Sequence, residues 1–155
     1  MNHGASGAET FILFELAGTT YGVPSSEVQQ LEMIERITPV PNAAKTVEGV
    51  VFSRGQMIPA ISLRARFGFE KIPYDLKTRL LVVNVDKRNI GLIVDSAREF
   101  KNIPAELISP PPDGLASLTG EYLAGIAAVG ENTILILNLA EVIKTEASEV
   151  AGTQT

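Results

Sequence analysis

The sequence predicts an all-β fold made of two small barrels, each with five strands and of SH3-like size, packed together with a few short helices. Two observations carry this prediction. About ten short apolar segments are separated by turn-forming residues along the 155-residue chain, and one strand–turn–strand segment occurs twice. Five short strands are too few for a two-sheet sandwich, so a closed barrel is the economical way to remove the exposed strand edges.

The segment that occurs twice begins near a glycine and runs into a leucine that opens a short helix. Its copies span Val47–Arg64 and Leu123–Val142, and Gly49 aligns with Gly125 at an offset of 125 − 49 = 76. The turns differ, because only the first copy contains Ser53-Arg54-Gly55. The repeat indicates two similar structural units, one of which carries an additional feature.

The first hairpins of the two halves also correspond, because Gly22 aligns with Gly91 at an offset of 91 − 22 = 69. We therefore expect one domain over residues 9–146, made of two barrel subdomains at approximately 9–72 and 78–146. An exchange of strands between the subdomains stays open. The small polar residues 1–8 and 147–155 are expected to form disordered tails.

Local patterns place the individual elements. Ser26 and Gln29 have the spacing of a capping box, and Val28 and Leu31 would share a helix face. In the first half we expect strands at Phe11–Leu16 and Tyr21–Val23, one or two helical turns from Ser26, an extended segment at Met33–Thr38, strands at Val50–Phe52 and Met57–Ile61, and a short helix from Ser62 to Gly68. The second half repeats this order with strands at Arg79–Val85 and Ile90–Val94, Ser96–Phe100 in the position of Glu27–Leu31, a helical turn at Pro104–Ile108, and the second copy of the repeated segment.

Composition and charge exclude several classes of function. The formal net charge of −5 disfavours nucleic-acid binding, which needs a basic face. The chain has no cysteine and its one histidine is His3, so no Ser–His or Cys–His nucleophile can be built, and we expect no metal site and no cofactor. No signal-peptide segment and no run of about 18 apolar residues is present, so we expect a cytoplasmic protein that does not insert into a membrane.

Two interpretations of the polar residues stay open at this point. Glu27, Glu32 and Glu35 could gather on one rim as paired carboxylates of a hydrolytic barrel, although acidic residues in an acidic protein more often form a solvated face. Arg54, held out by two strands, is either a solvated hairpin arginine or a contact for a partner's carboxylate or carbonyl group.

Motifs along almost the whole ordered chain carry a family resemblance. They are Phe11-x-Leu13-x-x-x-x-Gly18-x-x-Tyr21-Gly22-Val23, Val28-Gln29, Gly49-Val50, Arg54-Gly55-x-x-Ile58-Pro59-x-Ile61-x-Leu63-Arg64, Ile90-Gly91-Leu92-Ile93-Val94-Asp95, Ile108-x-Pro110-x-Pro112, Glu121-Tyr122-Leu123-x-Gly125 and Ile134-Leu135-Ile136-Leu137-Asn138. In their order and spacing the chain resembles the chemotaxis coupling proteins of the CheW family.

The resemblance implies two five-stranded SH3-like barrels around a hydrophobic groove, and a non-enzymatic adaptor that is a monomer when free. The implied partners are the regulatory domain of a CheA-type histidine kinase and the cytoplasmic tip of a chemoreceptor, in arrays to which the cytoplasmic adaptor is recruited. The motif positions that the family uses for fold or partner binding are Val28, Gln30, Gly49, Arg54, Gly55 and Gly91.

The chain also departs from the family pattern. Gln30 stands where a glutamate is usual, Phe52-Ser53 replaces Asn-Leu, and Ser62 stands where Asp or Asn is common. If that glutamate normally restrains the arginine, Arg54 has lost an ionic partner. These departures leave a second hypothesis open: a divergent scaffold or competitor in a non-flagellar chemosensory system, which binds array components without activating the kinase.

Overall fold

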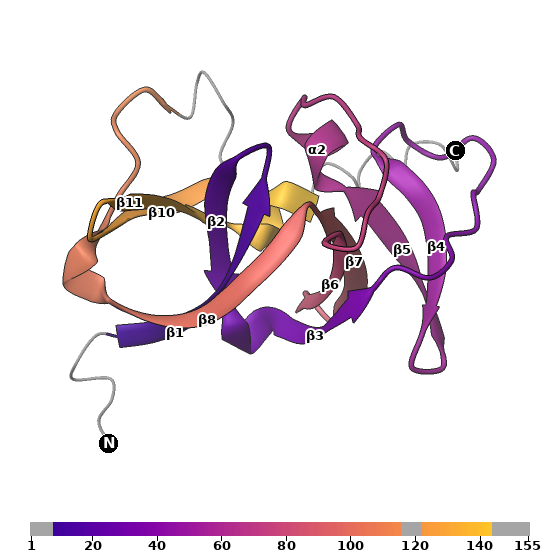
Figure 1. Cartoon of the computed structure of the whole chain (residues 1–155), viewed down its shortest axis with the longest axis horizontal. Coiled ribbons are helices and arrows are strands. Elements are labelled where there is room, and N and C mark those ends of the chain that lie inside the picture. The colour runs from indigo at the N-terminus through magenta and orange to yellow at the C-terminus, as the bar shows by residue number, and fades with distance from the viewer. Residues whose placement is uncertain (1–7, 116–121, 144–155) are drawn as a thin grey trace.

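The chain forms two sheets that each curl into a barrel, in a computed structural model that describes residues 8–115 and 122–143 (Figure 1). The six-stranded barrel has the order β8 (Ser96–Pro104), β1 (Ala8–Leu16), β2 (Thr19–Pro24), β11 (Asn132–Leu137), β10 (Leu123–Val129) and β9 (Ile108–Ser109). The five-stranded barrel has the order β3 (Val28–Met33), β6 (Arg79–Val85), β7 (Arg88–Val94), β5 (Gln56–Ser62) and β4 (Val47–Ser53). The short helical elements are η1 (Ser25–Glu27), α2 (Leu63–Arg66), η2 (Ala105–Leu107) and residues 139–143.

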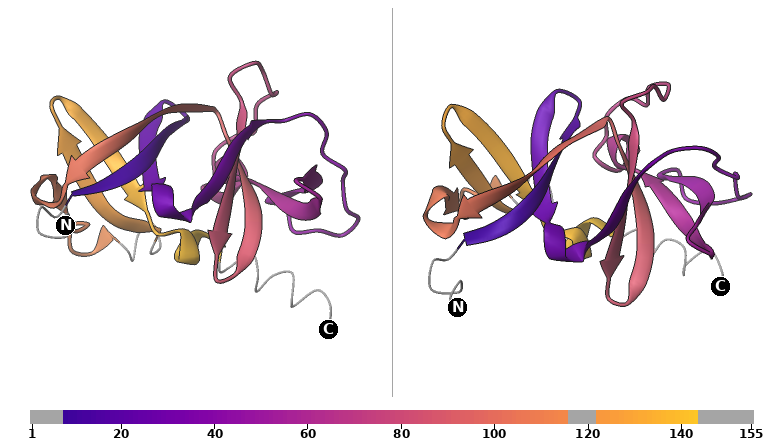
Figure 2. Two further views of the ribbon diagram at one scale, coloured as in Figure 1. Left: turned by 90° about the horizontal axis from the view of Figure 1, so that it is seen from below. Right: turned by 60° about the horizontal axis from the view of Figure 1, so that its bottom comes forward.

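The two barrels lie side by side along the long axis of the molecule (Figure 2), with the indigo β1 and the yellow-orange β11 in the same barrel. The all-β prediction of two small barrels is confirmed, with β9 as an additional sixth strand in one of them. The predicted boundaries at 9–72 and 78–146 do not follow the barrels, because one barrel combines residues 8–24 with 96–137 and the other holds 28–94. The exchange of strands left open by the sequence is therefore present.

The exchange follows the internal repeat. Each first hairpin pairs in parallel with the second hairpin of the other half: Gly22 lies opposite Ile136, and Gly91 lies opposite Ala60. The internal repeat relates these two pairs. The offset of 69 takes Gly22 to Gly91 (22 + 69 = 91), and the offset of 76 takes Ala60 to Ile136 (60 + 76 = 136). The barrels are thus two copies of one arrangement, each assembled from both halves of the chain.

Each barrel closes at an equivalent place. In the five-stranded barrel, the segment after β3 reaches β4, where Thr38 and Val50 exchange two backbone N–H···O bonds of 2.9 Å each. In the six-stranded barrel, the chain continues from β8 through η2 into β9, which pairs with β10 at Ile108 and Ser109.

Buried side chains lie on both faces of the central strands. On β1, Phe11 and Leu13 point into the six-stranded barrel, whereas Ile12, Phe14 and Leu16 join a core shared by both barrels. On β6 the same alternation holds, with Leu80 and Val82 in the interior of the five-stranded barrel and Leu81, Val83 and Val85 in the shared core. This explains the near-continuous apolar runs of the two strands, because alternate side chains enter two different cores.

Gly49 allows the five-stranded barrel to close. Its φ is +151°, and a Cβ atom at this position would lie 2.1 Å from the Thr38 carbonyl oxygen and 2.9 Å from Ile37 Cγ2. No side chain fits between the two segments at this distance. Gly49 therefore has a structural role: it brings residues 37–38 against β4.

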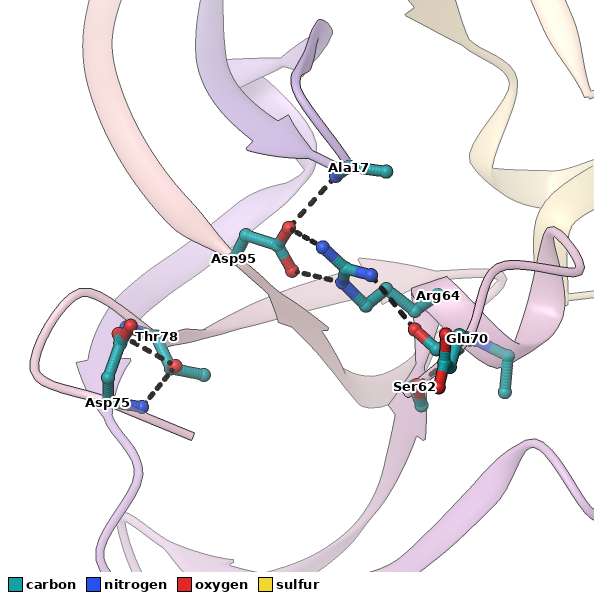
Figure 3. Close-up of polar contacts among 8 residues, drawn as sticks. Ala17, Ser62, Arg64, Glu70, Asp75, Thr78 and Asp95 are labelled. Atoms are coloured by element: carbon teal, nitrogen blue, oxygen red, sulfur yellow. Dashed lines mark hydrogen bonds and ion pairs between the residues drawn. The ribbon is translucent and has the colours of Figure 1, made fainter. Parts of the chain in front are cut away.

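An ion pair connects the two barrels (Figure 3). Arg64 on α2 donates two hydrogen bonds to Asp95, from Nε to Oδ1 at 2.8 Å and from Nη2 to Oδ2 at 2.7 Å. Asp95 Oδ2 also accepts a 2.9 Å bond from the Ala17 N–H in the β1–β2 turn, and Arg64 Nη1 donates to the Glu70 carbonyl oxygen. Partial burial acts to raise the pKa of Asp95, but the hydrogen bonds from Arg64 and Ala17 outweigh it and hold that pKa below its ordinary value.

Two sequence-based predictions of helix are confirmed, one of them by η2 within the expected turn at Pro104–Ile108. One further prediction is confirmed only in its first turn, and one is wrong. Only Ser25–Glu27 is helical near Ser26, because Val28–Met33 pairs with β6 as a barrel strand, and Ser96–Phe100 lies in β8. The short helix after Ser62 is confirmed: Ser62 Oγ accepts a hydrogen bond from the Ala65 N–H as a helix cap. Of the predicted tails, Ala8 begins β1, and the remaining residues lie outside the described part of the chain.

We expect Gly49→Ala to lower the free energy of unfolding by roughly 2–4 kcal/mol, because it adds steric overlap to backbone strain. Gly18→Ala is the matched control, since Gly18 also has positive φ (+83°) but has nothing within 4 Å of its Cβ position; it should cost only about 1 kcal/mol. Urea denaturation measures both. Equal losses in the two variants would contradict the close-approach role of Gly49.

The lowered pKa of Asp95 predicts a loss of stability in acid. A carboxyl whose folded-state pKa is depressed contributes stability that is present above the unfolded-state value, about 3.9, and is lost as pH falls through the folded-state value. The free energy of unfolding should therefore fall below about pH 4, and less steeply in Asp95→Asn than in wild type or in the exposed control Glu99→Gln. Identical pH profiles for Asp95→Asn and wild type would refute this contribution.

Candidate partner-binding site

The tip of the β4–β5 hairpin presents Arg54 (lower right in Figure 1). Arg54 and Gly55 form a two-residue turn with φ of +49° and +83°, the signs of a type I′ turn, whose twist matches the two flanking strands. Ala17 and Lys87 occupy hairpin turns with similar positive φ. The turn geometry therefore does not require arginine, and the fold leaves the choice of side chain at position 54 free.

The Arg54 side chain is exposed, and within residues 8–115 and 122–143 its guanidinium group makes no ion pair or hydrogen bond. A guanidinium group carries five donors in a planar fork that suits a carboxylate or several carbonyl oxygens. The site thus offers an unused cation on a short turn, which is suited to binding an anionic or carbonyl-rich surface of another molecule.

The strand residues on both sides of the turn are tied to neighbouring strands. On one side, the Gln30 side-chain amide on β3 donates hydrogen bonds to Ser53 Oγ and Glu32 Oε2, and Ser53 Oγ donates to Glu32 Oε2 at 2.6 Å. This polar network crosses from β3 to β4, where the two ends of the five-stranded sheet meet. Ser53 is 7% exposed, so its hydroxyl group is satisfied inside the barrel mouth rather than by bulk water.

On the other side of the turn, Asn84 Nδ2 donates to Asn89 Oδ1 at 2.8 Å, and Asn89 Nδ2 donates to Gln56 Oε1 at 2.9 Å. Ser53 and Gln56 form the last strand pair before the turn. Both are held by side-chain hydrogen bonds, so Arg54 is presented from a fixed base. The turn therefore loses less conformational entropy when a partner binds to it.

The predicted site residues fall into two groups. Gln30, Arg54 and Gly55 lie together at the mouth of the five-stranded barrel, and Gln30 and Arg54 line the same small pocket. Val28 begins β3 two residues before Gln30, is half-buried, and packs against the shared core. Their role in partner binding stays a prediction.

Gly49 and Gly91 form the second group and are buried. A Cβ atom on Gly91 would lie 2.7 Å from Leu80 Cδ1 in the interior of the five-stranded barrel. Both glycines have a clear role in packing. Substitutions at these positions would change partner binding only by distorting the barrel. Their direct contact with a partner also stays a prediction.

Sequence reasoning missed the polar network around Gln30. The sequence pattern placed Glu32 only in an acidic rim. It indicated that Arg54 has lost an ionic partner if the family's glutamate at position 30 normally restrains the arginine. Had the segment been recognised as a strand, Gln30 and Glu32 would have been placed on one face of β3. Val28 does not belong to that face, because a register shift follows it and it packs against the shared core.

An apolar groove lies between the barrels, as the family resemblance implied. It has a volume of about 570 Å³, and its walls include Tyr21 and Leu135 from the six-stranded barrel and Phe67 from the segment after α2. Phe14 stacks on Tyr21, and tilted ring contacts connect Tyr21 with Phe67 and Phe67 with Tyr122, at centroid distances of 5.3–5.9 Å. The groove is therefore lined by aromatic side chains from both barrels that contact one another.

The described part of the chain holds no group of three or more His, Cys, Asp or Glu side chains placed to bind a metal ion. It also contains no helix that is long and apolar enough to cross a membrane.

Comparison with known proteins identifies the family. Residues 10–147 match the family described as CheW-like domain. The chain is 29% identical over 143 residues to the chemotaxis protein CheW of Klebsiella aerogenes, covering 92% of this chain and 86% of that protein. It is 27% identical over 139 residues to the protein FrzA of Myxococcus xanthus, covering 88% and 86%.

Among solved structures, the chain resembles the scaffolding protein TtCheW from Thermoanaerobacter tengcongensis with a TM-score of 0.83 and 29% identity, covering 91% of this chain and 96% of that one. The fold and the sequence lead to the same assignment. The chain belongs to the CheW family of chemotaxis coupling proteins, which act as scaffolds or adaptors.

Proposed function

We propose that this protein is a non-enzymatic adaptor that couples the cytoplasmic tips of chemoreceptors to the regulatory domain of a CheA-type histidine kinase. In this proposal the protein is monomeric when free, needs no cofactor, and is recruited from the cytoplasm to membrane-associated receptor arrays. Membership of the CheW family supports the proposal, as does the similarity to TtCheW, a scaffolding protein.

The observation that carries the proposal is the exposed Arg54 turn, whose flanking residues Ser53 and Gln56 are held by side-chain hydrogen bonds. Binding modules place their contact residues on loops held by a rigid scaffold, and hydrogen bonds on both sides of this turn anchor it to β3 and β7. The six sequence-predicted residues take different roles in the proposal: Arg54, Gly55, Gln30 and Val28 form or border the contact surface, while Gly49 and Gly91 maintain the barrel beneath it.

A second candidate function is a divergent scaffold that occupies array components without activating the kinase. The polar network of Gln30, Ser53 and Glu32 favours it, because two of its members are residues at which the chain departs from the family pattern. The similarity to FrzA does not distinguish between the two functions.

The two functions are separable in a reconstituted system. Purified protein is titrated with a CheA regulatory domain and, separately, with a receptor-tip helical hairpin. Kinase activity is then measured in a mixture of the protein, the full-length kinase and the receptor. We expect binding to both partners and activation of the kinase. Binding without activation would support the divergent scaffold, and the absence of binding to either partner at tens of micromolar would reject both functions.

Arg54→Asn should separate binding from stability. Asparagine tolerates positive φ better than arginine and is favoured in type I′ turns, so the free energy of unfolding should stay unchanged or rise by about 0.5–1 kcal/mol. Loss of the guanidinium group should weaken kinase-domain binding roughly tenfold, equivalent to about 1.4 kcal/mol. Thermal unfolding and calorimetric titration measure the two effects.

Lys87→Asn is the matched control, because Lys87 is also an exposed cation at positive φ (+65°) in a hairpin turn. It should stabilise the fold to a similar degree while changing binding by less than about twofold. An equal loss of affinity in the two variants would show a general effect of charge and contradict a specific role for Arg54.

A further inference from the structure

Residues 69–77, which we call the strap, connect α2 to β6 and have few contacts with the rest of the protein (Figure 1). Every residue of the strap is exposed, and none belongs to a strand or a helix. The backbone N–H groups of residues 70–72 and 74 donate no hydrogen bond within the described part of the chain. A segment with few buried apolar contacts and solvent-exposed backbone groups opens locally at a low cost in free energy.

The strap spans a cavity instead of packing directly on the five-stranded barrel. The cavity has a volume of about 240 Å³. Ile72 and Pro73 of the strap line one side, and the sheet contributes Ser62 and Ile93, the last parallel pair between β5 and β7. Atoms that face a void lose dispersion contacts on that side, so the strap gains little from packing. Ser62 is only 6% exposed, and a bulky molecule reaches it only when the covering residues move.

Two contacts with Glu48 on β4 hold the middle of the strap in place. Lys71 Nζ lies 2.6 Å from Glu48 Oε2, and the Tyr74 hydroxyl donates a 3.3 Å hydrogen bond to Glu48 Oε1. The Lys71 side chain is 53% exposed, so solvent screens this ion pair and it contributes little to stability. The strap is therefore attached to β4 by weak contacts that a single substitution can remove.

The first residues of the strap contact both features that join the two barrels. The Glu70 carbonyl oxygen accepts a 2.8 Å hydrogen bond from Arg64 Nη1, on the guanidinium group that also binds Asp95 (Figure 3). Phe69, the preceding residue, lines the apolar groove between the barrels. When the strap moves away, Arg64 loses a hydrogen bond that orients its guanidinium group, and solvent screens the ion pair more strongly.

We propose that the strap is a conformational device whose opening uncovers the cavity and loosens the Arg64–Asp95 connection between the barrels. In the closed state Arg64 is aligned with Asp95, which also accepts the 2.9 Å hydrogen bond from the Ala17 N–H of the other barrel. Phe69 and Glu70 are consecutive residues, so a molecule that binds better to the closed arrangement of Phe69 shifts the strap toward its closed state. The inference goes beyond the proposed function and needs neither of its partners.

The absence of cysteine from the chain allows strap opening to be measured by thiol labelling. Ser62→Cys places a single thiol at the cavity. Ser53→Cys is the matched control, because Ser53 is also buried, at 7% exposed, but does not line this cavity. Labelling by the bulky reagent DTNB is followed in each protein alone and in combination with Lys71→Ala, Phe69→Ala or Leu76→Ala. Leu76 serves as the control position on the strap, since it is 82% exposed and lines neither the cavity nor the groove.

A second measurement follows the connection between the barrels. Amide exchange at Ala17 reports it, because the Ala17 N–H donates to Asp95. Exchange is compared in the wild-type protein and in the three strap variants without a cysteine. Thr78→Cys is a second thiol reporter, since Thr78 is 7% exposed and lines the same cavity; it keeps the labelling test available if loss of the Ser62 cap prevents folding.

We expect Lys71→Ala and Phe69→Ala to speed labelling of Ser62→Cys about two- to fivefold, the range that loss of a weak surface contact implies. Exchange at Ala17 should speed up by a similar factor. The control substitution on the strap should change neither rate, and labelling of the control thiol should stay constant in all backgrounds.

Three results would overturn the inference. The first is an unchanged rate of labelling of Ser62→Cys in both Lys71→Ala and Phe69→Ala. The second is equal acceleration at Ser53→Cys, because this would show global unfolding instead of movement of the strap. The third is unchanged exchange at Ala17 in variants whose cavity thiol is labelled faster, because the strap would then open without loosening the connection between the barrels.

Discussion

The structure depends on two hairpins that are apolar on both faces. In β1 and β6 consecutive residues are buried, because odd and even side chains enter different cores. A single small barrel can bury only the inner face of such strands, and its outer face would remain in water. The two barrels must therefore pack against each other, and the shared core is part of the folding unit rather than an interface between independent domains.

The exchange of strands makes this dependence stronger. Each barrel takes its first hairpin from one half of the chain and its second hairpin from the other, so neither half contains a complete barrel. The Arg64–Asp95 pair adds a polar connection at the junction, because Asp95 also binds the Ala17 N–H in the other barrel. Its two side chains are 18% and 22% exposed, which reduces the screening that weakens most surface ion pairs.

The candidate site arises from the way in which the five-stranded barrel closes. Close approach at Gly49 joins residues 37–38 to β4 by backbone bonds, but three residues later the two segments have separated. There, side chains of Gln30, Ser53 and Glu32 hold the strands together in place of a backbone ladder. The candidate site therefore lies where backbone closure of the barrel gives way to side-chain contacts.

Local sequence patterns predicted the strands of both repeats, the short helix after Ser62 and the Arg54 turn, and the motifs along the chain indicated the family. These depend on neighbouring residues, since alternation, caps and turn residues act over a few positions. Tertiary contacts produced the strand exchange, formed a strand at Val28–Met33 where capping residues had indicated a helix, and placed Gln30 against Ser53. These depend on register between segments far apart in the chain, and a local pattern is compatible with more than one such pairing.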